Sequence, residues 1–271
     1  MMRRSLAFSV LILAAALAGV VLSGSKAASP SNKVLIVHDE LPQMEVLAEF
    51  LREEGGLDVT VVEQSALPED WSGYRAVLGY IHRVLEVPTE KAIIAYTENG
   101  GRFIALHHSI SSKKADNEFY FDFLGIRLDD PAEAKNPVMP GGGYGWRDET
   151  LTLVNLNPAH YITSHSVTWG DEIAYTSSDE PSVEALYPSL TLHESEVYMN
   201  HKFTDGREKT VLMGFKFLDD RNGQMFMQDR AGWLKKYGKG EVVYLMPGHS
   251  ATDFENENFA QMILNAITWE P

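Results

Sequence analysis

The stretch Lys33-Val34-Leu35-Ile36-Val37-His38-Asp39 begins the part of the chain that decides the fold. Its continuous apolar run is typical of a strand that is buried on both faces of a sheet. A helical pattern with apolar residues at Met44, Leu47 and Leu51 follows, and Gly55-Gly56 ends it. A buried strand followed closely by a helix predicts the first unit of a parallel α/β sheet.

The same alternation of strand and helix continues toward the C-terminus. We therefore expect an α/β fold with a doubly wound, mostly parallel sheet and helices on both of its faces. The stretch 129–147 is rich in proline and glycine and predicts a loop over the rim of the sheet. Further strands are predicted over 57–62, 75–81, 102–106, 150–154, 209–217 and 240–246, and helices over 89–98 and 258–269.

The first residues have the composition of an export signal. Met1-Met2-Arg3-Arg4 is basic, residues 6–22 form an almost unbroken apolar run, and Ser25-Lys26-Ala27 places small residues before a cleavage point. Residues 1–27 are predicted to be a cleaved signal peptide, 28–32 a linker and 33–271 the folded domain. An uncleaved membrane anchor is the alternative, because the apolar run approaches the roughly 17 residues that span a bilayer. Either interpretation places the domain outside the cytoplasm, secreted or periplasmic if the segment is cleaved and anchored to the membrane if it is not.

The composition excludes several classes of function. The 271 residues carry a net charge of −15, which disfavours nucleic acid as a partner. The chain has no cysteine, so disulfides, thiolate metal ligands and thiol nucleophiles are all excluded. The chain also lacks a Gly-x-Ser-x-Gly elbow, a phosphate-binding loop and a dinucleotide-binding glycine pattern after the first strand, which disfavours serine hydrolases and nucleotide enzymes.

Histidines gather where the predicted strands end. In an open parallel sheet, ligands bind beyond the carboxyl ends of the strands. Histidine exchanges protons near neutral pH, and its neutral form binds divalent metals. The sequence thus predicts a histidine-rich site at this edge. Five of the nine histidines belong to it: His38, His82, His107, His108 and His249.

A carboxylate is needed to orient an imidazole or to complete a metal shell, and residues 192–201 are dense in such groups. If this segment is extended, Glu194, Glu196 and Tyr198 share one face. Three rim aromatics, Tyr144, Trp146 and Trp169, are candidates for stacking on sugar rings. Imidazoles with a carboxylate favour zinc or a similar transition ion, although a metal-free acid–base site is also open.

Three stretches resemble the trehalose-utilisation (ThuA-like) family, a branch of the class I glutamine amidotransferase-like, flavodoxin-like fold. They are Gly100 to Ser109 with its histidine pair, Trp233 together with 237–249, and Asn265-Ala266-Ile267-Thr268-Trp269. The family's Asp-Glu-x-Tyr segment is matched by Glu196 and Tyr198, with Ser195 in place of the aspartate. Glu172, in Asp171-Glu172, is the competing candidate for the family glutamate.

The resemblance implies a carbohydrate-active lyase or hydrolase that acts on disaccharides or glycosides, including 3-keto sugars. It implies that His107 or His108 is the base, that His249 or a metal stabilises an enediolate, and that Glu196 or Tyr198 is the proton donor. His38, His82, Tyr144 and Trp146 would contact the sugar. Glutamine hydrolysis is excluded, because histidine follows the strand 102–106 where a cysteine would be required. The alternative is a non-catalytic carbohydrate-binding or surface-assembly module.

Overall fold

In a computed structural model of the protein, residues 31–129, 142–205 and 208–271 are described. The predicted signal segment 1–27 and most of the linker 28–32 lie outside these residues, as does much of the expected rim loop. Among the residues that the structure describes, no helix is both long and apolar enough to cross a membrane.

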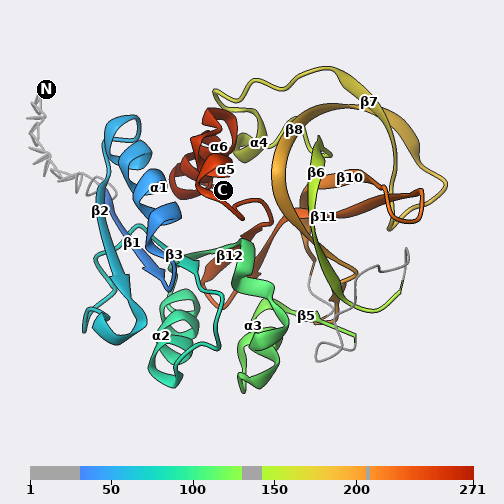
Figure 1. The fold of residues 1–271 in the computed structure, drawn as a ribbon. Coiled ribbons are helices and arrows are strands. Elements are labelled where there is room, and N and C mark those ends of the chain that lie inside the picture. Colours follow the sequence, from blue (N-terminus) through green and yellow to red (C-terminus); the bar gives the residue numbers. More distant parts are fainter. Residues whose placement is uncertain (1–30, 130–141, 206–207) are drawn as a thin grey trace, which may run out of the picture. The chain divides into compact units, whose positions relative to one another are not determined.

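A ten-stranded sheet organises the domain, in the order β2-β1-β3-β4-β12-β11-β10-β6-β8-β7 (Figure 1). A two-stranded sheet, β5 with β9, lies apart from it. The strands are β1 (Lys33–His38), β2 (Asp58–Glu63), β3 (Ala76–Tyr80), β4 (Arg102–Leu106), β5 (Ile126–Arg127), β6 (Gly145–Asn155), β7 (Glu172–Thr176), β8 (Glu184–Met199), β9 (Lys202–Phe203), β10 (Thr210–Asp219), β11 (Gln224–Tyr237) and β12 (Gly240–Leu245).

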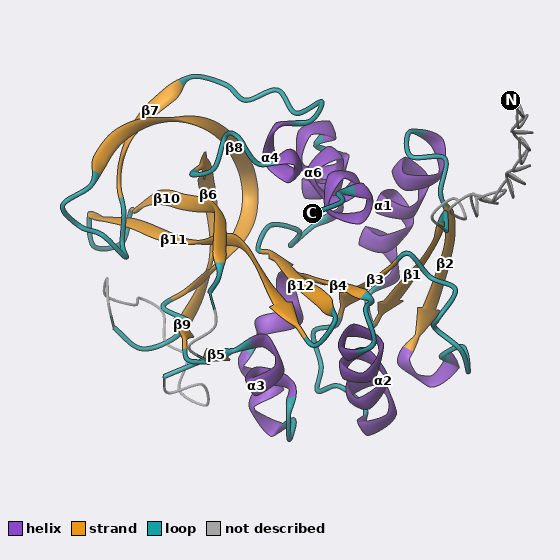
Figure 2. Ribbon diagram, turned by 180° about the vertical axis from the view of Figure 1, so that it is seen from behind, coloured by secondary structure: helices purple, strands orange, loops and turns teal. Residues whose placement is uncertain are grey.

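The half of the sheet from β2 to β12 has the predicted α/β character. Its neighbouring strands are parallel, and β1, β3, β4 and β12 are almost entirely buried. Helices α1, α5 and α6 cover one face, and α2 and α3 cover the other (Figures 1 and 2). The helices are α1 (Leu41–Glu53), α2 (Val87–Glu98), α3 (Tyr120–Leu124), α4 (Tyr161–Ser164), α5 (Ala251–Glu255) and α6 (Glu257–Thr268), with 3-10 turns η1 (Gln64–Ala66), η2 (His107–Ile110) and η3 (Ser112–Asp116).

The other half corrects the expectation of a mostly parallel sheet. Strands β12, β11, β10, β6, β8 and β7 pair antiparallel, so the sheet as a whole is mixed. The long strand β8 curves strongly, and the antiparallel half of the sheet curves with it, as Figure 2 shows. The end of the predicted rim loop is also different, because Gly145 to Arg147 already belong to β6. These strands lack the continuous apolar runs of buried parallel strands, because one of their faces is polar or exposed.

A candidate metal and acid–base site

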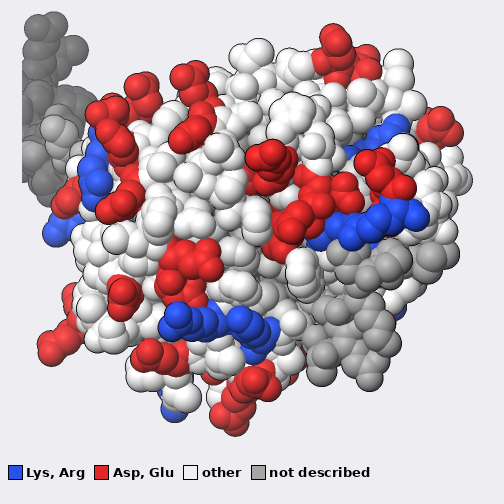
Figure 3. Space-filling view, viewed as in Figure 1, with Lys and Arg blue, Asp and Glu red and all other residues white. Residues whose placement is uncertain are grey.

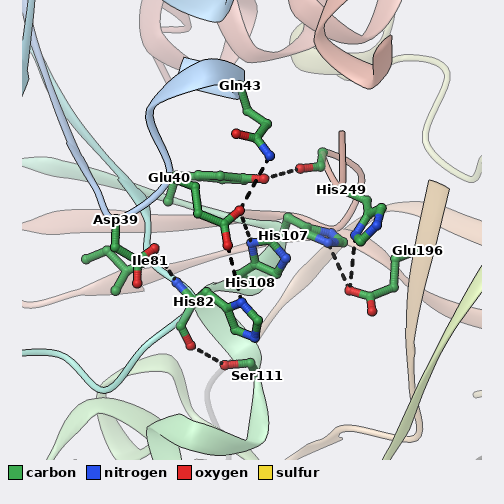
Figure 4. A network of polar contacts seen from close by, with 12 residues as sticks. Asp39, Glu40, Gln43, Ile81, His82, His107, His108, Ser111, Glu196 and His249 are labelled. Carbon is green, nitrogen blue, oxygen red and sulfur yellow. Dashed lines mark hydrogen bonds and ion pairs between the residues drawn. The ribbon is translucent and has the colours of Figure 1, made fainter. Parts of the chain in front are cut away.

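The carboxyl ends of the parallel strands bring four of the predicted histidines together (Figure 4). His107 and His108 follow β4, His82 follows β3, and His249 follows β12. Glu196 reaches the same place from β8, in the antiparallel half. The site is thus built where the two halves of the sheet meet.

His107 and Glu196 form the closest contact of the site. His107 Nδ1 lies 2.7 Å from the carbonyl oxygen of Met246, so this nitrogen carries the proton and donates it. The lone pair of a neutral ring is then on Nε2, which lies 3.0 Å from Glu196 Oε2. Two acceptors repel each other at this distance. A cation, either an extra proton on His107 or a metal ion, is therefore required between them.

Four side chains converge on this point. One ligand atom from each of His107, His108, Glu196 and His249 lies within 4.8 Å of the others. Four buried atoms of this group make no hydrogen bond: His107 Nε2, His108 Nδ1, Glu196 Oε2 and His249 Nδ1. Buried polar atoms are rarely left without partners, and imidazoles with one carboxylate are the ligands that zinc and similar ions prefer. The residues present therefore fit a divalent transition metal.

The protonation states follow from burial and contacts. Burial alone would raise the pKa of Glu196, but its interactions with His107 and His249 outweigh burial and hold this pKa well below the usual range. The contact with Glu196 raises the pKa of His249. Burial lowers the pKa of His108 strongly and raises that of Tyr198 well above its usual value. Near neutral pH, Glu196 is therefore ionised, His108 is neutral and Tyr198 keeps its proton.

The backbone around the two strand ends is shaped for this arrangement. His107 has a φ of 42°, in the left-handed region, so the chain turns sharply as it leaves β4. Gly248 has a φ of 124°, and a Cβ atom at this position would lie 2.7 Å from the Phe254 ring. Asp253 accepts hydrogen bonds from the backbone N–H groups of Gly248 and His249. These features fix the direction in which His107 and His249 point.

A second group adjoins the first and shares His108 with it. Glu40 Oε1 lies 3.3 Å from His82 Nδ1, and Glu40 Oε2 lies 3.8 Å from His108 Nδ1. Glu40 is a site residue that was not predicted from the sequence. Its position after β1 places it at the same carboxyl edge as the histidines, which is the signal that could have indicated it.

Other predicted residues lie outside both groups. His38 is buried on β1, and burial lowers its pKa. Tyr144 is 2% exposed, stacks on Tyr198 and donates to the carbonyl oxygen of Ile110, so it supports the site from behind. Trp146, on β6, is 42% exposed and is open to a ligand.

The two candidates for the family glutamate lie in different parts of the structure. Glu172 is exposed on the edge strand β7, whereas Glu196 faces the histidines. Glu194 has a φ of 54° beside a shift in the β6–β8 register, so it does not continue the alternation on which its predicted face depended. Trp169 is partly buried and donates to the carbonyl oxygen of Thr163.

Comparisons with known proteins agree with this architecture. The sequence profile of the ThuA family, described as trehalose utilisation, matches residues 31–270. A protein from Bacteroides uniformis ATCC 8492 described as thua-like is 16% identical, with a TM-score of 0.56 over 90% of this chain and 93% of that one. The beta-galactosidase from Bacillus circulans sp. alkalophilus is 12% identical, with a TM-score of 0.51 over 88% of this chain but 31% of its own.

These structural similarities concern the fold, since the identities are low. No match was found among curated proteins. The family match spans nearly all of the residues that the structure describes, including both groups of the site. The chain therefore belongs to the ThuA (trehalose utilisation) family.

Proposed function

We propose that this chain is an exported, metal-assisted enzyme that acts on disaccharides or glycosides carrying a 3-keto group. The facing acceptors His107 Nε2 and Glu196 Oε2 carry the proposal, because their contact needs a cation. Export rests on the composition of residues 1–27, and a neutral sugar suits a chain with a net charge of −15 better than nucleic acid does. Figure 3 shows that acidic side chains cover more of the visible face than basic ones do.

His107, Glu196 and His249 would hold the metal. Three protein ligands are typical of catalytic zinc sites, in which a further position stays open. The hydrogen bond from His107 Nδ1 to the Met246 carbonyl oxygen fixes the ring so that Nε2 faces the ion. A metal bound here would polarise a carbonyl oxygen as a Lewis acid.

The remaining side chains supply the proton transfers. In a 3-keto sugar the carbonyl acidifies the proton on C2, and neutral His108 accepts it. The electrons of the C2–H bond form the enediolate. When they return, they form a C1–C2 double bond and expel the glycosidic oxygen from C1. Tyr198 keeps its proton and can donate it to that oxygen, whereas ionised Glu196, the other predicted donor, cannot.

We further propose that the parallel half is a class I glutamine amidotransferase-like frame. The sharp turn after β4, with its positive φ at His107, is the type of turn on which such enzymes present a nucleophile. Here the position holds an imidazole and the chain has no cysteine, so the frame serves acid–base or metal chemistry instead.

The test combines elemental analysis with activity. The purified chain is assayed on 3-keto disaccharides before and after chelation, together with Glu196→Gln and a matched control, His193→Ala, which changes an exposed histidine of β8. We expect bound zinc or a similar ion, turnover that chelation abolishes, and an inactive Glu196→Gln variant.

Three other outcomes would contradict parts of the proposal. Unchanged turnover after complete metal removal would refute the metal assistance. Free sugars in place of an unsaturated product would indicate hydrolysis in place of elimination. Sugar binding without turnover would favour a non-catalytic carbohydrate-binding module.

A further inference from the structure

Glu40, His82 and His108 form a compact set of ligand atoms beside the first group. One ligand atom from each lies within 4.8 Å of the other two. The His82 and His108 rings are stacked, with centroids 4.5 Å apart and planes 10° from parallel. Figure 4 shows the Glu40 carboxylate above the two rings, with a dashed line to each. Separations of 3.3 and 3.8 Å between the carboxylate oxygens and the ring nitrogens suit donors around one ion.

The buried nitrogen of His108 points to a missing partner. His108 Nδ1 is buried and makes no hydrogen bond, and its 3.8 Å separation from Glu40 is too long for one. A neutral imidazole has a single lone pair, so His108 can ligate only one ion. The first group already has three other ligands in His107, Glu196 and His249. The nitrogen that faces Glu40 is therefore free to serve the second group.

We propose that Glu40, His82 and His108 bind a second divalent transition metal ion, beside the ion held by His107, Glu196 and His249. This inference rests on the proposed function to the extent that the two ions would act on one substrate. It changes one assignment there: a His108 whose lone pair binds this ion cannot take the C2 proton, which an oxygen of the Glu40 carboxylate would accept instead. Paired metals can hold two neighbouring oxygens of a substrate. A keto group next to a hydroxyl group, as in a 3-keto sugar, offers such a pair.

Hydrogen bonds to the backbone of the neighbouring turns fix the position of this second group. The carboxylate of Asp39 accepts the backbone N–H groups of His82 and Arg83, each at 2.8 Å. The buried ammonium of Lys114 donates to the carbonyl oxygens of both His82, at 2.9 Å, and His108, at 3.1 Å. The turns that follow β3 and β4 are thereby fixed to each other, which sets the spacing of the two rings.

The group is open on its other side. The side chains of Glu40 and His82 are 34% and 40% exposed, whereas that of His108 is 5% exposed. A bound ion would therefore have the buried ring of His108 on one side and water or substrate on the other. This is the arrangement of a catalytic site, in which one or more coordination positions remain open.

Metal stoichiometry tests the inference without relying on activity. The full chain is stripped with a chelator, titrated with Co²⁺ while its visible absorption is followed, and analysed for bound metal after gel filtration. Four single variants and one double variant are compared with the unaltered chain. The single variants are Glu40→Gln and His82→Ala in the second group, Glu196→Gln in the first, and His193→Ala as the exposed control. The double variant combines His82→Ala with Glu196→Gln.

We expect two equivalents of Co²⁺ in the unaltered chain and in the control. Each of the other variants should bind one equivalent, and the double variant with His82→Ala and Glu196→Gln should bind none. Because His82 is partly exposed, we expect His82→Ala to leave the fold intact. If His82→Ala does not fold, Glu40→Gln tests the same group with a side chain of the same shape. Thermal unfolding without metal checks this for each variant.

The remaining outcomes separate the two metal sites. If the unaltered chain binds one equivalent and both His82→Ala and Glu40→Gln still bind it, the second site is refuted and the first site stands. No metal in the unaltered chain would overturn both. If the unaltered chain binds one equivalent that is lost in His82→Ala and retained in Glu196→Gln, the ion belongs to the second group and the first site is contradicted.

Discussion

Asp253 Oδ2 accepts a hydrogen bond from the backbone N–H of His249 at 2.9 Å. The same oxygen accepts the Gly248 N–H at 3.0 Å and the Ser195 hydroxyl at 2.6 Å. Ser195 precedes Glu196 on β8, so a single buried carboxylate fixes both the His249 and the Glu196 side of the first group. Its position on α5 explains how the parallel and antiparallel halves of the sheet are held in one arrangement at the site.

We expect Asp253→Ala to lower the free energy of unfolding by roughly 3 kcal/mol, because it leaves three buried donors without their acceptor. Urea denaturation of the metal-free protein measures this loss. Ser195→Ala should cost less, about 1 kcal/mol, since it removes only one of the three hydrogen bonds. Asp220→Ala, at an exposed position on the surface, is the control. Equal stability of Asp253→Ala and the control would refute the role of this carboxylate.

The positive φ of His107 predicts an unusual order of stability for two small substitutions at this position. A residue with a Cβ atom loses about 1 kcal/mol in the left-handed region, and glycine does not. His107→Gly should therefore be more stable than His107→Ala by about 1 kcal/mol, although both lack the imidazole. Denaturant unfolding of the two variants gives the difference. The usual order, with alanine more stable than glycine, would show that the turn relaxes when the side chain is lost.

The parallel half of the fold and the edge that carries the site could be predicted from the sequence. Buried parallel strands are continuous apolar runs, and the predicted strand 102–106 coincides with β4. Histidines that follow such strands must meet, because the carboxyl ends of parallel strands lie at one edge. For this reason His82, His107, His108 and His249 could be placed together without coordinates.

The antiparallel half could not be predicted in the same way. Strand β8 carries charged residues and a register shift near Glu194, which breaks the alternation of period two. The approach of Glu196 to His107 depends on how this strand curves, and the local sequence does not determine that curvature. The burial of Tyr144 behind Tyr198 is likewise a consequence of long-range packing.

His201 predicts how stability depends on pH. Burial lowers the pKa of this side chain well below 6.5, and its Nε2 accepts a hydrogen bond from Trp233 Nε1 at 3.2 Å. The unfolded chain therefore binds a proton that the folded chain excludes. Stability contributed by His201 is fully present above the unfolded pKa of about 6.5 and is lost below it, by about 1.4 kcal/mol per pH unit.

His201→Gln should remove this part of the pH dependence. Urea unfolding of the metal-free protein between about pH 7 and pH 5 compares the two slopes. Other histidines with lowered pKa values contribute to both proteins, so the difference between the slopes isolates His201. Identical slopes would mean that the folded protein accepts the proton at this site.

Trp146 lies beside the candidate site, where the proposed function would place the sugar next to the reacting ring. In the β6–β8 pair, Trp146 lies opposite Tyr198 and Asp148 lies opposite Glu196, so all four side chains share a face. The contact of Asp148 Oδ1 with His249 Nε2, at 3.8 Å, shows that this face is the one that looks into the site. The exposed indole therefore extends the site along β6.

We expect Trp146→Ala to raise KM for a disaccharide roughly fivefold and to change kcat little, because stacking on a sugar ring contributes about 1 kcal/mol and does not touch the reacting atoms. Trp146→Phe should recover part of the affinity. Leu218→Ala, which removes another exposed apolar side chain from a different strand, controls for a general effect of surface changes. A monosaccharide substrate would lack the second ring, so its KM should be insensitive to Trp146→Ala. Equal sensitivity of the two substrates would instead place the indole against the reacting ring.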